Sequence, residues 1–269
     1  MGKRPKIALV LLLLLATGVS AESLTTRQRA EWHRHSRPRL GLHGGVTTLK
    51  IDERLNTDGY LVNHSYMAGL SAEGHSRFIG VDMEGYLGSA SVSSGSNRAF
   101  LQAKEISMKV FGALANIHAE HLFNAGPVYL RPKLGLGYGL TSLSVEGDLA
   151  FLNAYAMNGG AKEVLHGPYV IGGLTVIPFW WMELSADYLQ SLATTFSMSG
   201  TINSNPVNLA NSDASFNRLR ASAMFRIASH VLLGAQFVQR QISVSFPLNL
   251  DGGLLSPRQR HFLGVLAIE

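Results

Sequence analysis

The chain has 269 residues, of which 15% are charged, a formal net charge of +5 and no cysteine. That length accommodates one or two domains, and the lack of cysteine excludes disulfides as a source of stability. The positive excess is confined to the N-terminus, because residues 40–269 contain 15 Lys and Arg against 16 Asp and Glu. We therefore expect no nucleic-acid partner.

The first 21 residues have the pattern of a secretory signal peptide. Three cations, Lys3, Arg4 and Lys6, precede the apolar run Ile7–Ala16, and small residues follow at 19–21. Cations, a short apolar run and a small-residue cleavage site are typical of such a peptide. The run is too short to cross a bilayer as a helix, which takes about 20 residues. We expect residues 1–21 to be removed after export.

The second segment, residues 22–38, is polar and basic and contains one tryptophan. Three roles stay open for it. It is a flexible leader, it folds over one end of the domain that follows, or its arginines contact anionic lipid headgroups.

The remainder of the chain carries strand-like patterns. In Val128–Leu140 the even positions are apolar or aromatic, whereas the odd positions are charged, small or amphipathic. A period of two places these sets on opposite faces of a sheet. Segments of this kind predict ten strands, at Arg39–Ile51, Ser65–Gly74, Phe78–Ser89, Leu101–Phe123, Gly126–Val145, Gly167–Pro178, Trp180–Ser197, Ser215–Ile227, Val231–Phe246 and Arg260–Ile268.

Long polar connections alternate with very short ones between these segments. The long ones are residues 52–64, 92–99, 146–166, 198–214 and 247–259, and the short ones lie near 75–77, 124–125, 178–179 and 228–230. Outer-membrane barrels combine short periplasmic turns with longer extracellular loops. The alternation therefore predicts an all-β fold, a closed antiparallel up-and-down transmembrane β-barrel over residues 39–269, with residues 22–38 as a basic periplasmic segment before it.

The strand count is less certain than the architecture, and eight or twelve strands stay open beside ten. Leu101–Phe123 is longer than the roughly 9–11 residues that a crossing strand needs. Its apolar residues also change phase, from even positions such as Val110 to odd positions such as Ile117. We expect either a β-bulge near Leu114–Asn116 or a break into two elements.

If the apolar face meets lipid, the opposite face lines a lumen that carries charges of both signs. The predicted lumen charge network consists of Asp82, Glu84, Glu105, Lys109, Arg131, Lys133, Glu183, Asp187, Arg218, Arg220 and Arg226. Buried charges need partners, and a narrow barrel has room only for side chains. We expect ion pairs to plug this lumen. A narrow conducting pore and a catalytic pair made of Asp82 and Glu84 are the alternatives.

Aromatic residues concentrate near the ends or faces of the predicted strands. Those that point outward are expected to form interfacial girdles. The candidates are Tyr66, Tyr86, Tyr129, Tyr138, Tyr169, Trp180, Trp181 and Tyr188.

The histidines give no clear metal or catalytic signature. His118, Glu120 and His121 lie closest together, but in a strand His118 and His121 point to opposite sides. The motifs G-x-S-x-G, H-E-x-x-H and the Walker sequence are absent. We therefore predict no metal site, no cofactor and no catalytic residue. An enzyme with Asp187 and His166 at the barrel mouth stays open as an alternative.

On its signal peptide and the pattern of residues 39–269, the chain resembles the small single-domain outer-membrane β-barrel proteins of Gram-negative bacteria. This class-level resemblance implies an outer-membrane location, insertion by the barrel-assembly machinery, surface loops, and contact with outer-membrane lipid and lipopolysaccharide. The ten-strand count is similar to that of the omptin proteases, but their catalytic acids and histidine match no positions here. Residues 266–269 also lack the aromatic ending usual in the class.

Three functions follow from these patterns. The favoured one is a non-enzymatic outer-membrane barrel that anchors an envelope protein partner, exposes loops or forms a narrow channel. The second is an outer-membrane hydrolase acting on lipid A or peptides. The third is a soluble periplasmic barrel that binds a ligand, with its apolar face turned inward.

Overall fold

The computed structural model divides the chain into two units, residues 1–35 and 36–269. The residues that it describes are 37–53, 65–76, 78–92, 101–103, 106–146, 149–151, 155–202, 205–211, 214–245 and 254–268. The expected signal peptide and nearly all of segment 22–38 lie outside this part. No helix among the described residues is long and apolar enough to span a membrane.

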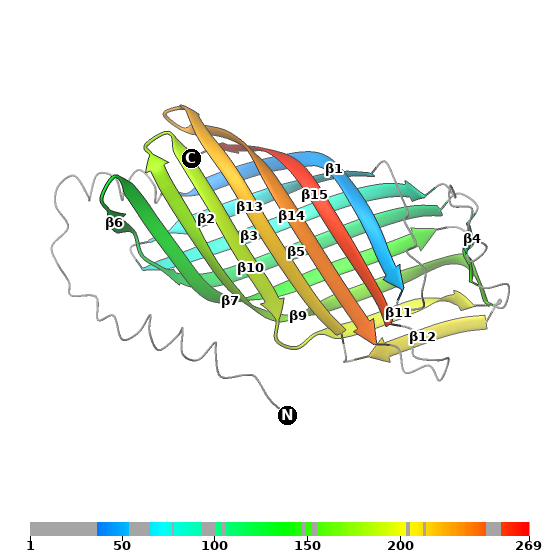
Figure 1. The fold of residues 1–269 in the computed structure, drawn as a ribbon. Coiled ribbons are helices and arrows are strands. Elements are labelled where there is room, and N and C mark those ends of the chain that lie inside the picture. The colour runs from blue at the N-terminus through cyan, green and yellow to red at the C-terminus, as the bar shows by residue number, and fades with distance from the viewer. Residues whose placement is uncertain are drawn as a thin grey trace. The chain divides into compact units, whose positions relative to one another are not determined.

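The described part is built from β-strands (Figure 1). They are β1 (Arg39–Glu53), β2 (Ser65–His75), β3 (Ile79–Val92), β4 (Leu101–Ala103), β5 (Ile106–Glu120), β6 (Phe123–Ala125), β7 (Val128–Glu146), β8 (Leu149–Phe151), β9 (Tyr155–Phe179), β10 (Met182–Ser191), β11 (Thr195–Ile202), β12 (Asn205–Asn211), β13 (Ala214–Ala228), β14 (Val231–Ser245) and β15 (Leu254–Ile268).

The long strands pair in a closed antiparallel ring. In the described part the path runs β1-β2-β3-β5-β7-β9-β10-β13-β14-β15 and returns to β1. Each long strand thus lies beside the next long strand in the sequence, which is the up-and-down order. The predicted all-β, closed, up-and-down barrel is confirmed.

The two ends of the ring differ in how the strands are joined. At one end the connections are short, at residues 76–78, 126–127, 180–181 and 229–230. Gly126 in one of these turns has a φ of 75°, a conformation that glycine adopts without strain. We call this end the turn end and the opposite end, where the longer connections lie, the loop end.

At the loop end the wall continues past the ring. The first part of β9 pairs with β11, and β11 pairs in turn with β12. β9 has 25 residues, more than twice the roughly 9–11 needed to cross a bilayer. β11 continues from β10 and β12 leads into β13, so these strands form a sheet extension of the ring.

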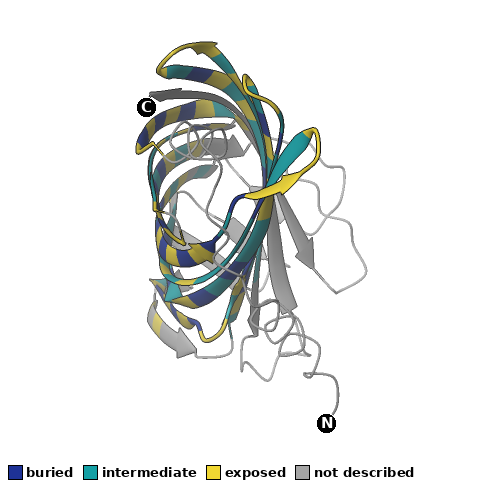
Figure 2. Cartoon of the chain, turned by 90° about the vertical axis from the view of Figure 1, so that its left-hand side faces the viewer, coloured by how far each residue is buried: buried dark blue, intermediate teal, exposed yellow. Residues whose placement is uncertain are grey.

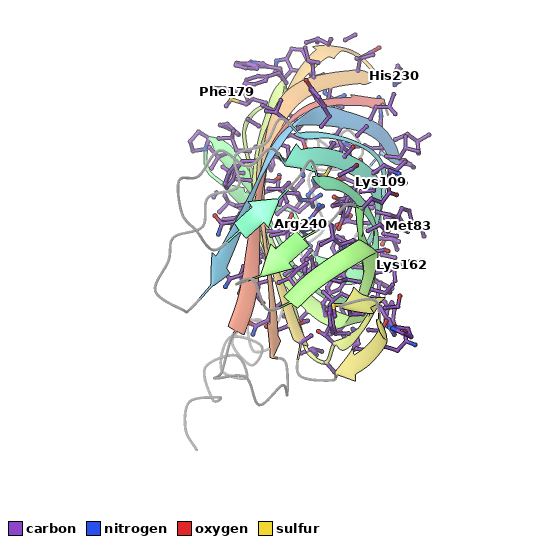
Figure 3. All side chains as sticks on the ribbon, turned by 90° about the vertical axis from the view of Figure 1, so that its right-hand side faces the viewer. Met83, Lys109, Lys162, Phe179, His230 and Arg240 are labelled. Carbon is purple, nitrogen blue, oxygen red and sulfur yellow. The ribbon has the colours of Figure 1, made fainter. Side chains whose placement is uncertain are left out.

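Burial alternates along the strands of the ring (Figure 2). The exposed side chains include many large apolar ones, such as Leu40, Leu70, Met83 and Leu136, of which Leu136 is 59% exposed. The buried ones include most of the charged residues of β3, β10 and β13. Figure 3 shows Met83 on the outside and Arg240 on the inside. A soluble ligand-binding barrel needs the reverse arrangement, so that alternative is wrong.

The predicted strand Leu101–Phe123 contains one ring strand, β5, with the three-residue strands β4 and β6 at its two ends, and not the two elements of the alternative. The β-bulge expected near Leu114–Asn116 is wrong, because the registers of β5 with β3 and β7 run through these residues without a shift. The even positions of β5 from Val110 to Glu120 face inward. Leu114 is an apolar residue inside the barrel, whereas Ile117 is exposed outside.

The change of phase in the sequence therefore reflects what fills the lumen. Towards the loop end the inside is apolar, with a cluster of Leu114, Leu165, Tyr169, Ile171, Leu189, Phe196, Met198 and Phe216. A second cluster contains Met67, Tyr86 and Val238, with Val110 packed against them. Towards the turn end the inside is charged.

Candidate functional site in the lumen

Glu84 on β3 lies at the centre of the charged part of the lumen. Its carboxylate accepts hydrogen bonds from Arg218 at 2.6 Å and from Arg240 at 3.0 Å. A third guanidinium, that of Arg220, lies 3.8 Å away. The three arginines that surround this carboxylate come from β13 and β14, and Arg218 and Arg240 are almost completely buried.

The ion pair of Glu84 and Arg218 crosses the full width of the barrel. In the ring, β3 and β13 are separated by β14, β15, β1 and β2 on one side and by β10, β9, β7 and β5 on the other. The two strands are therefore on opposite sides of the ring. A direct contact of 2.6 Å between their side chains leaves no room for an aqueous path between them.

Asp187 on β10 extends this network. It accepts a hydrogen bond of 2.6 Å from Arg220 and one of 3.3 Å from Arg218. Lys133 on β7 joins Asp187 to Asp82 on β3, with nitrogen–oxygen distances of 3.8 and 3.0 Å. Acids and bases thus alternate across four strands, which is the arrangement that buried charges require.

Above this layer, towards the loop end, Arg240 also contacts an aromatic ring. Its guanidinium carbon lies 3.6 Å from the centre of the Tyr86 ring. The Tyr86 hydroxyl lies 3.1 Å from that of Thr141 on β7. A desolvated cation over an aromatic face is stabilising, so Tyr86 links the charged layer to the apolar clusters.

Nearer the turn end a second charged layer surrounds Glu183 and Glu120. Arg39 on β1 donates two hydrogen bonds to Glu183 on β10, at 2.7 and 2.8 Å. Arg131 lies between the two acids, 3.9 Å from Glu183 and 4.0 Å from Glu120. Glu120 also contacts two imidazoles, those of His75 and His118. These three residues are the ones in the described part that are placed to hold a metal ion.

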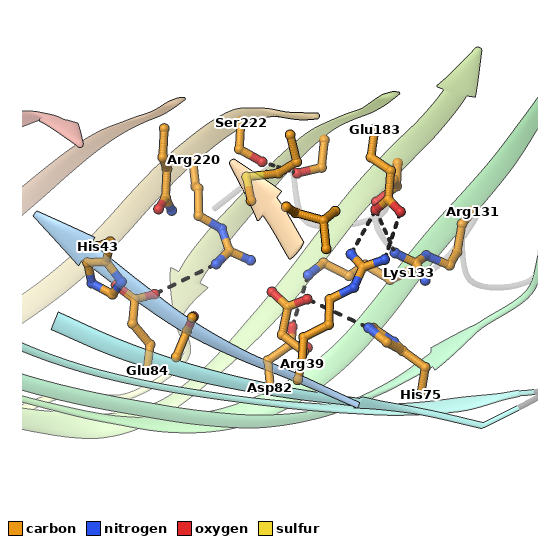
Figure 4. A pocket seen from close by; sticks show the side chains of 18 of the residues that line it. Arg39, His43, His75, Asp82, Glu84, Arg131, Lys133, Glu183, Arg220 and Ser222 are labelled. Atoms are coloured by element: carbon orange, nitrogen blue, oxygen red, sulfur yellow. Dashed lines mark hydrogen bonds and ion pairs between the residues drawn. The ribbon is translucent and has the colours of Figure 1, made fainter. Parts of the chain in front are cut away.

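The space left between the two layers is small (Figure 4). The cavity has a volume of about 80 Å³ and is lined by charged and hydroxyl-bearing side chains such as Arg39, Glu84, Lys133 and Ser222. A water molecule needs roughly 10–15 Å³ by this measure, whereas pockets for small molecules have about 300–1,000 Å³. The cavity has room for a few water molecules and is too small for an organic substrate.

The structure does not bring together the residues of the hydrolase alternative. His166 is on the outer side of the barrel, where Nδ1 lies 2.6 Å from the hydroxyl of Tyr138, which is 53% exposed. Asp187, Asp82 and Glu84 point inward and contact cations. These carboxylates are held by arginine and lysine, and His166 lies on the other face of the barrel wall.

Apart from Lys109, the predicted lumen residues fall into three groups. Asp82, Glu84, Arg131, Lys133, Glu183, Asp187, Arg218 and Arg220 line the lumen and take part in ion pairs. Arg226 lies near the turn end, where it donates to the carbonyl of Ser229. Glu105 lies outside the described residues.

The assignment of Lys109 to the lumen is wrong. Its side chain is 61% exposed and pairs with Glu146 at 2.9 Å. It shares the outward parity of Phe111 on β5. The expected bulge would have turned this part of the strand by one residue, and without it Lys109 faces outward.

Sequence reasoning missed several lumen residues, namely Arg39, His75, His118, Glu120 and Arg240. His118 and Glu120 share the inward parity of Leu114 on β5. Arg240 shares the parity of Val238 and Leu232 on β14, which are fully buried. Strand parity opposite to apolar Ile117 could have found His118 and Glu120. Arg240 shares its parity with apolar residues, so parity alone places it towards lipid.

Among the expected girdle residues, Tyr66, Tyr138, Trp180, Trp181 and Tyr188 are exposed, whereas Tyr86 and Tyr169 are buried inside. Near the turn end the outward aromatic rings stack. Trp181 lies 5.2 Å from Phe179 and 6.1 Å from Phe225, and His121 lies 5.5 Å from Phe78. We call these residues the aromatic collar.

No protein-family model matches the chain, and no curated protein matches it. Solved structures do match. The outer membrane protease OmpT from Escherichia coli has 11% identity and a TM-score of 0.55, over 86% of this chain and 96% of that one. The fold is that of an outer-membrane β-barrel.

Two autotransporter barrels are similar over nearly their whole lengths. The transport unit of AIDA-I from Escherichia coli has 12% identity and a TM-score of 0.48, over 100% of this chain and 99% of that one. The translocator domain of NalP from Neisseria meningitidis has 9% identity and a TM-score of 0.47, over 96% and 98%. At such identities the likeness concerns the fold alone.

Proposed function

We propose that this protein is an outer-membrane barrel with a closed lumen, which does not conduct and which anchors the segments at its loop end outside the membrane. The observation that carries the proposal is the ion pair of Arg218 and Glu84 across the width of the barrel. Wide aqueous channels occur in barrels of 16–18 strands, and narrow barrels are filled by side chains.

The outer face supports a membrane location. Large apolar side chains cover it on every ring strand whose outward side chains are described, including Leu42, Leu87, Leu174 and Leu219. The aromatic collar lies at the turn end, where an interfacial girdle is expected. Such a face is stable in contact with lipid and costly in water.

The sheet extension supports the anchoring role. β9, β11 and β12 stay hydrogen-bonded past the point where β9 leaves β10. At the end of this ladder Ile202 pairs with Asn205, on either side of residues 203–204. Binding segments are commonly carried on loops that a rigid scaffold positions, so a closed barrel with a rigid extension suits presentation to a partner.

Conductance in planar lipid bilayers tests the closed lumen. We expect the folded protein to insert without producing steps of ion current under an applied voltage. Exposed Lys109→Gln serves as a matched control and is expected to behave like the wild type. Reproducible current steps from the folded wild-type barrel would overturn the proposal.

Surface labelling tests the anchoring role. An epitope inserted at residues 203–204 should be bound by antibody on intact cells. The same epitope inserted at residues 229–230, in a turn, should be bound only after the outer membrane is permeabilised. The opposite result, or recovery of the protein in the soluble periplasm, would count against the orientation or the location.

A further inference from the structure

Three side chains inside the turn end of the barrel converge on one point. His75 is the last residue of β2, and His118 and Glu120 lie two positions apart on the inward face of β5. β3 separates these two strands in the sheet. The side chains of all three are at least nine-tenths buried, at 5%, 0% and 1% exposure.

The distances among these groups match those among the ligands of a tetrahedral metal ion. Glu120 places one carboxylate oxygen 3.0 Å from Nδ1 of His75 and the other 3.3 Å from Nε2 of His118. A zinc ion with bonds of about 2.0–2.1 Å holds neighbouring ligand atoms roughly 3.3 Å apart. Each of the three residues offers a ligand atom within 4.8 Å of those of the other two.

Each imidazole also has an acceptor behind it. Nδ1 of His118 lies 2.9 Å from the amide oxygen of Asn116, with Asp82 at 3.8 Å. Nε2 of His75 faces Glu73 at 3.7 Å. Metal-binding histidines usually donate their second N–H to such an oxygen. When His118 donates from Nδ1, its Nε2 lone pair faces the Glu120 carboxylate, and a cation between them removes the repulsion.

Gly80 on β3 makes room for this arrangement. A Cβ atom at this position would overlap the His118 ring. Glycine in the interior of a strand costs stability and often marks a close approach of another group. The glycine lets the imidazole lie across β3 towards His75, and the ring centres are 6.3 Å apart.

The charges around the cluster leave it acidic. Glu183 is paired with Arg39, and Asp82 with Lys133. Of the remaining charges near the imidazoles, Glu120 and Glu73 are negative and Arg131, 4.0 Å from Glu120, is positive. With neutral histidines this cluster has one carboxylate more than cations, whereas in the neighbouring layer three arginines share the carboxylates of Glu84 and Asp187. A cation bound at the cluster would therefore lie at a local excess of negative charge.

We propose that His75, His118 and Glu120 form a binding site for a divalent transition-metal ion, with Zn²⁺ as the best match. Two imidazoles and one carboxylate with an open fourth position are a known zinc ligand set. The cavity of about 80 Å³ is lined by His75 and Glu120 and gives room for a water molecule as the fourth ligand. The ion would tie β2 to β5 across β3 at the turn end.

Calorimetric titration with Zn²⁺ tests the site. The full-length barrel, folded in detergent without a polyhistidine tag and stripped with a chelator, should bind one ion tightly. His75→Gln should weaken this binding by at least about 100-fold, since even the loss of a group behind a ligand costs about 10–100-fold. The matched control is His166→Gln, which removes a histidine from the outer face.

Replacing zinc by Co²⁺ gives a second readout, since four-coordinate cobalt absorbs visible light strongly. We expect this absorption in the wild type and in His166→Gln, and its loss in His75→Gln and His118→Gln. A wild-type barrel without a tight site, or a tight site that survives in His75→Gln, would overturn the proposal. The three side chains would then be connected by hydrogen bonds only. The titration of the wild-type barrel tests the proposal even if a variant fails to fold, because the lack of a tight site in the wild type is enough to overturn it.

Discussion

Among single residues, Glu84 contacts three arginines inside the barrel. It is 8% exposed and contacts Arg218, Arg220 and Arg240. Glu84→Gln leaves these buried cations with one anion fewer, and breaking a buried pair costs roughly 3–5 kcal/mol. We expect a loss of that size in the free energy of unfolding, measured by tryptophan fluorescence in urea with lipid vesicles.

The matched control is the exposed pair of Lys109 and Glu146. Glu146→Gln should change the free energy of unfolding by less than about 1 kcal/mol, because solvent screens an exposed pair. Equal effects of Glu84→Gln and Glu146→Gln would show that the buried network does not stabilise the barrel.

Glu163 provides a pH-dependent element in the sheet extension, beyond the part of β9 that pairs with β10. Burial raises the pKa of its carboxyl from 4.5 to about 7. The unfolded chain loses this proton at lower pH than the folded one, so stability falls as the pH rises from 4.5 towards 7. In Glu163→Gln the thermal midpoint should fall less over this range. Identical slopes in the two proteins would contradict the assignment.

Residue parity explains which site residues the sequence could give. Asp82, Glu84, Glu183 and Asp187 alternate with large apolar residues, so their inward direction follows from the pattern alone. Lys109 was misplaced because β5 has apolar residues on both its lumen face and its lipid face. The alternation of apolar and polar residues then does not tell which face is inside.

At the level of the strands, interior glycines set how closely the inward side chains pack. A Cβ at Gly112 on β5 would overlap the Tyr86 ring, which is held by Arg240 and Thr141. A Cβ at Gly85 on β3 would meet no other atom within 4 Å. The two glycines therefore differ in what surrounds them and not in their secondary structure.

We expect Gly112→Ala to lower the free energy of unfolding by roughly 1–3 kcal/mol, since the buried ring cannot move aside without strain. Gly85→Ala should be neutral or stabilise the barrel by up to about 1 kcal/mol. Urea unfolding of the two variants gives the comparison. A neutral Gly112→Ala would mean that Tyr86 is free to move.

Connection lengths carried more information about the strands than periodicity did. A short turn can join two consecutive strands only when they are antiparallel neighbours. The alternation of long and short connections therefore predicted the up-and-down order. The sheet extension could not be foreseen. Residues 146–166 and 198–214 have polar connection-like compositions, yet parts of them pair as β9, β11 and β12.

For the whole molecule, the decisive property is which strands face one another across the ring. The sequence gives the order of neighbours, but opposite strands depend on strand number and stagger, which a single-strand pattern does not encode. The contacts of β3 with β13 and of β1 with β10 therefore came only from the structure. These ion pairs between strands that are not neighbours in the ring close the lumen.

The central claim is that the outer face of the ring strands meets lipid and that the lumen is closed to bulk water. The chain contains no cysteine, so single cysteines can be introduced at Leu174, Thr175 and Lys109 and tested with a charged, water-soluble thiol reagent. Leu174 is exposed on the outer face, Thr175 lines the lumen cavity, and Lys109 is exposed near the loop end, where β5 begins and β7 ends.

In lipid vesicles we expect Lys109→Cys to react, and Leu174→Cys and Thr175→Cys to be protected until the protein is unfolded. Rapid reaction of the folded Thr175→Cys barrel would show an open aqueous lumen, and rapid reaction of Leu174→Cys would show an outer face in water.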